Sequence, residues 1–266
     1  MILILKKKIK KITIITIPLI IVVALGLSTA LTYVGNFSDP VSVFFKKIYP
    51  AKFVGPGYIS VYYKQQGMAL GQSADQMVKI KKEQNLIEKL QIPYSNSNFD
   101  QELKFDTSGK TNEYQALLAK SFFGNPQLYY DFVVKPQTYD ALLRVKYNSD
   151  FSGNEAAYSR AQSILSKIQS GDSFDDLAKA DSDDKLTGQL GGDLGVIPTD
   201  ELLPELQEAI DQSQPGQIIS HLVISRLGYH ILDPIESVDQ NNQKLWHVKH
   251  ILIQTSGFDQ WLSSQL

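Results

Sequence analysis

The residues with the clearest chemical potential are two histidine-bearing segments and one acid. His230 lies in the run Gly228–Leu232, and Asp184 lies in a polar Ser/Asp turn. Near the other end of the chain, His247 and His250 have a spacing that could suggest a metal site. A strand would point these two side chains to opposite faces, so no metal site is predicted. The sequence has no cysteine, which excludes a thiolate nucleophile and a cysteine metal site.

A glycine-rich stretch, Gly191-Gly192-Asp193-Leu194-Gly195, follows Asp184. Closely spaced glycines are unfavourable inside a helix because each costs backbone entropy there. They permit positive φ angles and let another segment of the chain approach the backbone closely. The stretch therefore predicts a tight turn against a neighbouring segment.

This stretch is one of several motifs that occur in a fixed order. The others are Gly171-Asp172-Ser173-Phe174-Asp175-Asp176-Leu177-Ala178, Ser182-Asp183-Asp184, Pro215-Gly216-Gln217-Ile218-Ile219-Ser220 and Gly228-Tyr229-His230-Ile231-Leu232. The ordered series resembles the parvulin family of peptidyl-prolyl cis–trans isomerases, where G-x-x-F-x-x-L-A, S-x-D, G-G-D-L-G, P-G-x-x-S and G-Y-H-I occur in that order. The resemblance implies an α+β domain with a small antiparallel sheet flanked by helices.

The resemblance also implies which residues form the site. His230, His250 and Asp184 match the catalytic positions, and the two histidines could form a hydrogen-bonded pair between neighbouring strands. The implied substrate-binding positions are Leu194, Leu202, Leu206 and Ser225. Leu206 stands where the family usually has Phe, which predicts a looser hold on a proline ring.

The implied reaction is a rotation about a peptide bond and needs few catalytic groups. The X–Pro bond rotates over tens to hundreds of seconds without help, because resonance makes the amide planar and dipolar. An apolar pocket disfavours that charge separation and so favours the twisted state, which lowers the barrier by differential binding. No bond is made or broken, so no cofactor and no metal are expected.

One family motif is out of place. A parvulin domain normally begins with a strand that carries H-[IL]-L-[IV], but Tyr139–Val145 has no histidine and fits a helix as well as a strand. The motif occurs instead at His250–Ile253. One explanation is a circularly permuted domain whose first strand is supplied by 247–254, and the other is a truncated tandem repeat. An orphan strand would expose an unpaired edge, which favours permutation.

The elements that must position the site are predicted as a helix from Asn154 to Gly171, a shorter helix at Phe174, a helix over Leu202–Ile210, and strands at Ile218–Ile224 and Gly228–Leu232. Residues 60–150 read as an all-helical domain, with Pro136 interrupting its last helix. In architecture this domain resembles the chaperone regions of SurA-type and PrsA-type foldases. We therefore expect a helical domain at 60–150 and a parvulin-like domain at 151–266.

The N-terminal region predicts a membrane anchor. Residues 12–34 form an uncharged run about as long as the roughly 20 residues that cross a bilayer. The lysine-rich tail 1–11 precedes it, and positive flanks stay in the cytoplasm. We expect a single-pass protein with a cytoplasmic N-terminus, a linker at 35–59 and the remaining domains outside the cytoplasm. A cleaved signal peptide is the alternative, although its apolar region is usually only about 7–15 residues long.

Composition separates the remaining function classes. The formal net charge of −2 argues against nucleic acid as a partner, which requires a basic face. The leading hypothesis is a peptidyl-prolyl cis–trans isomerase that acts on unfolded, proline-containing polypeptides. The alternatives are a catalytically weak parvulin-fold chaperone and an adaptor that recruits partners at the membrane.

Overall fold

The computed structural model describes residues 70–122, 124–240 and 243–266. The predicted cytoplasmic tail, transmembrane helix and linker at 1–59 lie outside these residues. Among the residues described, no helix has both the length and the apolar run needed to cross a membrane. Residues 80–119 and 124–266 form one compact unit, which contains the whole sheet.

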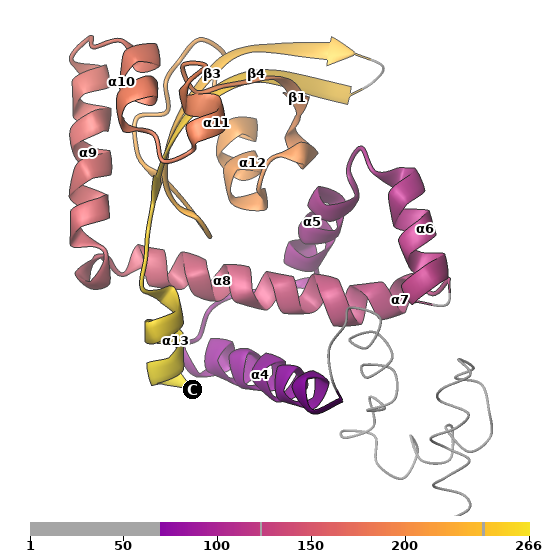
Figure 1. The fold of residues 1–266 in the computed structure, drawn as a ribbon. Helices are drawn as coiled ribbons and strands as arrows, with labels where there is room; N and C mark the ends of the chain where they lie inside the picture. The colour runs from indigo at the N-terminus through magenta and orange to yellow at the C-terminus, as the bar shows by residue number, and fades with distance from the viewer. Residues whose placement is uncertain (1–69, 123, 241–242) are drawn as a thin grey trace, which may run out of the picture. The chain divides into compact units, whose positions relative to one another are not determined.

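Helices dominate the first half of the described chain (Figure 1). They are α4 (Leu70–Lys89), α5 (Asn96–Thr107), α6 (Thr111–Ser121), α7 (Pro126–Tyr129) and α8 (Lys135–Ser149).

Pro136 does not interrupt the last helix, contrary to prediction. Tyr130–Val134 widens into a π-helical turn, and the Lys135 N–H donates to the carbonyl of Tyr130, five residues back. This local widening accommodates the proline without a break.

The second half adds helices around a sheet. The helices are α9 (Glu155–Gln169), α10 (Phe174–Asp181), α11 (Lys185–Gly188), α12 (Pro204–Asp211) and α13 (Phe258–Gln265), with short 3₁₀ turns at Phe151–Gly153 and Thr199–Glu201. The strands are β1 (Asp193–Pro198), β2 (Val223–Ser225), β3 (Gly228–Gln240) and β4 (Gln243–Gln254). The α+β class with a small antiparallel sheet flanked by helices is confirmed.

The sheet order is β1-β4-β3-β2, so β4 lies between two partners (Figure 1). The segment Tyr139–Val145, for which strand and helix competed, lies within the helix α8. The strand β4, which carries His250, pairs with β3, which carries His230. The permuted interpretation requires this pairing. β4 is therefore not an orphan strand. The domain boundaries themselves stay a prediction.

Alternation along β3 and β4 divides the core between the two faces of the sheet. Tyr229, Ile231, Ile251 and Ile253 pack with the apolar side chains of α9 and α10. On the other face, Leu232, Trp246 and Val248 pack with Leu206 and Ile210 of α12. Both histidines of the predicted site belong to the α12 face, because His230 is opposite Leu252 and His250 is opposite Leu232.

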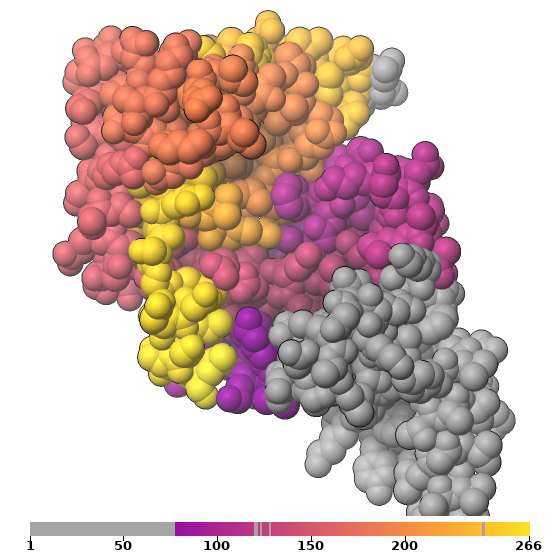
Figure 2. Space-filling view, viewed as in Figure 1, coloured from indigo at the N-terminus to yellow at the C-terminus, as the bar shows by residue number. Residues whose placement is uncertain are grey.

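The end of the chain packs on α8. The yellow C-terminal segment lies on the surface of the molecule in Figure 2, and α13 contacts α8. The Arg144 guanidinium lies 4.0 Å from the centroid of the Phe258 ring, and the Tyr147 hydroxyl donates to the Ser256 carbonyl at 2.5 Å. These contacts hold the end of β4 beside the last turn of α8.

Candidate active site

The two histidines lie on neighbouring strands with their rings stacked. The ring centroids are 5.7 Å apart and the ring planes differ by 27°. His230 is 1% exposed and His250 is 6% exposed. The expected hydrogen bond between them is not formed, and within the described residues each Nδ1 atom is buried without a hydrogen-bond partner. The offset of two residues between their strand positions stacks the rings instead of aligning their nitrogens.

Asp184 approaches His250 from the loop before α11. Its Oδ2 lies 2.9 Å from His250 Nε2. The same carboxylate caps α11, since its Oδ1 accepts from the backbone N–H groups of Leu186 and Thr187. Burial raises the pKa of Asp184, but hydrogen bonds from Thr187 and His250 outweigh it, and the net shift is downward. The catalytic candidates Asp184 and His250 are thus brought together.

Thr187 completes this group, although the sequence analysis missed it. Its hydroxyl donates to Asp184 Oδ2 at 2.7 Å and lies 2.9 Å from His250 Nε2. The available signal was its spacing, because a residue three positions after a helix-capping acid lies within reach of that acid. Thr187 fixes the carboxylate and the imidazole relative to each other.

Ser225, a predicted substrate-binding residue, lies beside His230 in the interior of the domain. It is fully buried, and its Oγ lies 2.8 Å from His230 Nε2 while accepting from the Leu227 N–H at 3.0 Å. Its assignment to substrate contact stays a prediction, and in this structure the Ser225 hydroxyl contacts His230. The buried Asn148 of α8, also missed, donates to the Ser225 carbonyl at 2.7 Å and accepts from the Thr255 hydroxyl.

The apolar substrate positions are part of the core. Leu202 and Leu206 are buried in the cluster on the α12 face, and Leu194 packs against its edge. Three grooves among the described residues are lined by other side chains, and not by these leucines or the two histidines. The assignment of these leucines as proline-pocket residues stays a prediction. The helix α12, which carries Leu206, packs directly on the sheet. Because Leu202 and Leu206 are buried, a proline ring can reach them only if α12 or a neighbouring segment moves.

His247 points away from this site. It lies on the opposite face of β4, as alternation predicts, with its Nε2 2.9 Å from Asp193 Oδ1. Its Nδ1 lies 3.9 Å from Glu236. The two histidines of the His247-x-x-His250 pattern therefore have separate carboxylate partners.

Both site histidines are neutral at pH 7. Burial, together with a smaller effect of the nearby His250, lowers the pKa of His230 to about 3, although Asp184 opposes the shift. Burial also lowers the pKa of His250, although Asp184 opposes that shift. Two stacked neutral imidazoles on an apolar face can donate and accept hydrogen bonds without introducing charge.

Mild acid is expected to destabilise the protein through these histidines. Because the folded-state pKa of His230 is far below the ordinary value near 6.5, the unfolded chain binds the extra proton between pH 6.5 and pH 3. The stability contributed by neutral His230 is therefore complete above pH 6.5 and is lost as the pH falls, by about 2 kcal/mol at pH 5. Urea unfolding from pH 7.5 to 5 measures this loss.

The matched controls are His230→Asn, which cannot titrate, and His221→Asn at an exposed site. His230→Asn should flatten the pH dependence and His221→Asn should not. Burial raises the pKa values of the acids Asp106, Asp211 and Asp233, which therefore act in the opposite direction. Their contribution is common to the wild type and both variants and cancels in the comparison. Equal slopes for the wild type and His230→Asn would contradict the assignment.

Comparison with known proteins agrees with this geometry. Residues 142–236 match the family model for the rotamase, or PPIC-type PPIase, domain. The match begins inside α8 and ends before β4, so the strand that carries His250 lies outside it.

Several curated proteins are similar over the same part of the chain. Chaperone SurA of Alkalilimnicola ehrlichii is 32% identical over 126 residues, which is 45% of this chain and 29% of that protein. Chaperone SurA of Nitrosococcus oceani is 30% identical over 109 residues, or 41% of this chain and 25% of that protein. Foldase protein PrsA 2 of Bacillus cereus is 42% identical over 72 residues, or 27% of this chain and 25% of that protein.

The chain spans between a quarter and a third of the length of these relatives. A crystal structure of a peptidylprolyl isomerase, PrsA from Bacillus anthracis, aligns at 18% identity over 71% of this chain and 85% of that chain. Its TM-score of 0.23 is too low to support a comparison of folds. The ordered motifs, the antiparallel sheet and the family match agree: this chain carries a parvulin-type rotamase domain of the PPIC type, similar to those of SurA and PrsA.

Proposed function

We propose that this chain is a peptidyl-prolyl cis–trans isomerase that assists the folding of polypeptides outside the cytoplasm. The observation that carries the proposal is the pair of neutral, buried histidines with their hydroxyl and carboxylate partners on one apolar face. Neutral histidines on an apolar face disfavour the dipolar planar amide and can hydrogen-bond the twisted one. The two histidines and their hydroxyl and carboxylate partners are all side chains of this chain.

The roles follow from position. His230 and His250 would contact the peptide group next to the proline, with Ser225 and the Asp184–Thr187 pair holding their rings. Leu194, Leu202 and Leu206 would receive the proline ring after the face opens. We further propose that the domain is permuted, with β4 in the place of the family's first strand, because β4 pairs with β3 and carries the first-strand motif.

The location is also a proposal. It is supported by the lysine-rich tail 1–11 and the uncharged run 12–34, which would leave the domains beyond residue 35 outside the cytoplasm. Unfolded or newly exported polypeptides that contain proline would be the clients. The similarity to proteins named chaperone and foldase supports polypeptide clients in general.

His250→Ala is expected to lower kcat/KM on a proline tetrapeptide by up to roughly tenfold, because a hydrogen bond between neutral groups contributes about 0.5–1.5 kcal/mol. Thr187→Val should act in the same direction, since the methyl cannot hold Asp184 and His250 together. Thr187→Ser keeps the hydroxyl and is the matched control. A coupled-protease assay of isomerisation measures all three.

If the histidines act as a unit, the His230→Ala/His250→Ala double variant will be little worse than either single variant. Near wild-type activity in a folded His250→Ala protein would place the reaction elsewhere.

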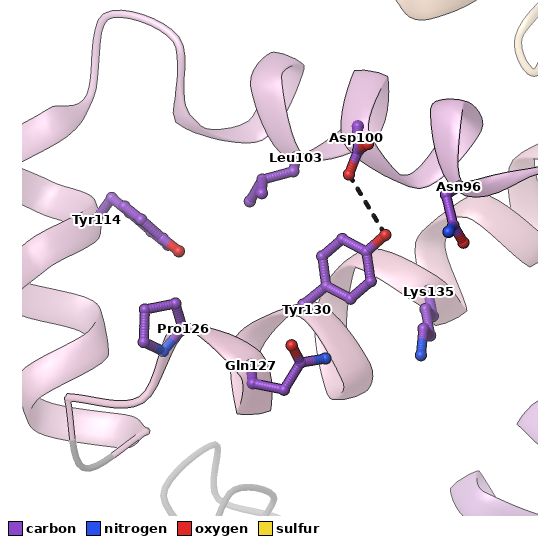
Figure 3. A pocket seen from close by; sticks show the side chains of 8 residues that line it. All are labelled: Asn96, Asp100, Leu103, Tyr114, Pro126, Gln127, Tyr130 and Lys135. Atoms are coloured by element: carbon purple, nitrogen blue, oxygen red, sulfur yellow. Dashed lines mark hydrogen bonds between the residues drawn. The ribbon is translucent and has the colours of Figure 1, made fainter.

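A second candidate function is client binding without efficient catalysis. A groove of about 420 Å³ lies among α5, α6, α7 and the π-helical turn (Figure 3). Tyr114, Tyr130, Leu103 and Pro126 offer apolar surface there, with Asp100 and Lys135 at its side. Apolar and charged side chains together suit an extended polypeptide. The burial of the two histidines also favours client binding without efficient catalysis. Suppression of client aggregation by a His230→Ala/His250→Ala protein would support it.

A further inference from the structure

Arg226 joins three segments of the chain at the edge of the histidine site. Its Nη1 and Nη2 donate to the two carboxylate oxygens of Glu102 in α5, each at 2.7 Å. Its Nε donates to Glu205 in the first turn of α12, at 3.0 Å. Arg226 itself lies in the turn between β2 and β3. We refer to Glu102, Arg226 and Glu205 as the Arg226 triad.

The triad is largely withdrawn from solvent. The side chains of Arg226, Glu102 and Glu205 are 15%, 3% and 16% exposed. Burial acts to lower the pKa of Arg226, but the hydrogen bonds and charges of Glu102 and Glu205 outweigh it and raise the pKa. A parallel pair of charge-assisted bonds fixes both distance and orientation. The contact therefore holds α5 at a defined place relative to the turn.

That place is the edge of the candidate active site. Besides the β2–β3 turn, α5 contacts α12 and the 3₁₀ turn Thr199–Glu201. The next residue after the 3₁₀ turn is Leu202, and α12 carries Leu206. Arg226 directly follows Ser225, which contacts His230. So α5 lies against all three segments that carry Leu202, Leu206 and Ser225.

A polar groove lies beside the triad, between α5 and α12. Its volume is about 520 Å³, and it is lined by Ser95, Ser97, Asn98, Gln101, Lys104, Gln207, Glu208, Asp211 and Gln212. Phe105 adds one aromatic contact, with its ring centroid 6.0 Å from the Arg226 guanidinium. Polar interfaces within a chain separate more easily than large apolar ones. The triad is thus the specific contact that fixes α5 to α12 and to the β2–β3 turn, whereas Phe99 of α5 packs separately on Tyr130 and Tyr139.

The site behind this contact is closed. Leu202, Leu206, His230 and His250 are all buried, so a proline ring can reach the histidines only after a segment moves. The bond from Arg226 to Glu205 crosses from the β2–β3 turn to α12. These two segments cannot separate while that bond persists, and Glu102 holds α5 over both.

We propose that the Arg226 triad is an autoinhibitory latch, which keeps α5 across the entrance of the histidine site until a client displaces the helix. This inference rests on the proposed isomerase function. Another face of α5 supplies Asn96, Asp100 and Leu103 to the groove in Figure 3. A polypeptide bound in that groove therefore contacts the helix that the latch holds.

Glu102→Gln tests the latch in the full-length chain. The amide has the shape of the carboxylate, and Arg226 keeps a balanced partner in Glu205, so the fold should survive. Loss of the bidentate ion pair should raise kcat/KM on a proline peptide by roughly tenfold. Hydrogen exchange should become faster in α5, in α12 and in the β2–β3 turn together, because release of the latch frees all three.

Asp140→Asn is the matched control. It is also an acid-to-amide change at an ion pair, with Arg144 at 2.6 Å, but that pair lies within α8. It should change neither exchange nor turnover. If Glu102→Gln fails to fold, Glu205→Gln replaces it, because that variant keeps the Arg226–Glu102 pair and frees only α12.

Three results would overturn the latch: unchanged or lower kcat/KM in folded Glu102→Gln, faster exchange in α5 alone, or the same changes in Asp140→Asn. Failure of the proposed isomerase function would give a result that differs from these three. If neither the wild type nor Glu102→Gln isomerises the peptide, the isomerase proposal and the inhibitory role both fall. The exchange data then still decide whether the triad holds α5 in place.

Discussion

Removal of residues 245–266 is expected to unfold the sheet domain. The deleted segment contains most of β4, which hydrogen-bonds to β1 on one side and β3 on the other. The deletion also removes the buried side chains of Trp246, Val248, Ile251, Leu252 and Ile253. Each contributes roughly 1.5–3 kcal/mol when buried, whereas a whole domain is stable by only about 5–15 kcal/mol. Thermal unfolding followed by circular dichroism should show no cooperative transition.

A shorter truncation separates the strand from the helix that follows it. Removal of residues 258–266 deletes only α13, with the buried side chains Phe258 and Leu262. This protein should melt at a lower temperature but should still unfold cooperatively, because the sheet keeps all its strands. If deletion of residues 245–266 left the melting temperature unchanged, β4 would be dispensable, and that result would falsify the permuted interpretation.

Gly192→Ala is expected to disrupt the candidate active site and the fold together. Gly192 has a φ of +82°, and a Cβ placed there would lie 2.3 Å from the carbonyl oxygen of His250. That oxygen cannot yield without moving β4, since the His250 N–H donates to the Gly192 carbonyl at 2.8 Å. Left-handed strain of about 1–2 kcal/mol adds to the lost packing and hydrogen bond, for a total of roughly 3 kcal/mol or more.

The comparison variant is Gly195→Ala. Gly195 has a similar φ of +75°, but a Cβ there would meet no atom within 4 Å. It should therefore suffer only the left-handed strain, about 1–2 kcal/mol, and should keep its activity. Denaturant unfolding of both variants isolates the steric part of the effect. If Gly192→Ala and Gly195→Ala lost equal stability, the clash between a Cβ at position 192 and the His250 carbonyl would have no effect, contrary to the geometry.

The local order of motifs predicted much of this domain correctly. Gly191 and Gly192 form the predicted tight turn against a neighbouring segment, and His230 lies on the predicted strand. The helix at Asn154 and the short helix at Phe174 are also present, as α9 and α10. Such features depend on residues close in sequence, so periodicity, caps and glycine spacing reveal them. The predicted strand Ile218–Ile224 was too long, because only Val223–Ser225 forms a ladder with β3.

The candidate site was less predictable where burial decides a role. A sequence shows that Leu202 and Leu206 are apolar, but the same pattern serves a core or a pocket. Ser225 illustrates the same limit, since a hydroxyl can face a substrate or, as here, a buried histidine. Thr187 and Asn148 act over separations of 63 and 77 residues from His250 and Ser225, which no local pattern contains.

By itself, the sequence determined the class of fold, the family resemblance and which histidines and acid form the candidate site, because these depend on residue types at short and fixed spacings. Only the tertiary structure decided that β4 lies between β1 and β3, that the histidines stack, and that Arg226 ties α5 to α12. The physical reason is that register and long-range ion pairs arise from segments that meet only when the chain closes on its core. Their partners, such as Glu102 and Arg226, are 124 residues apart.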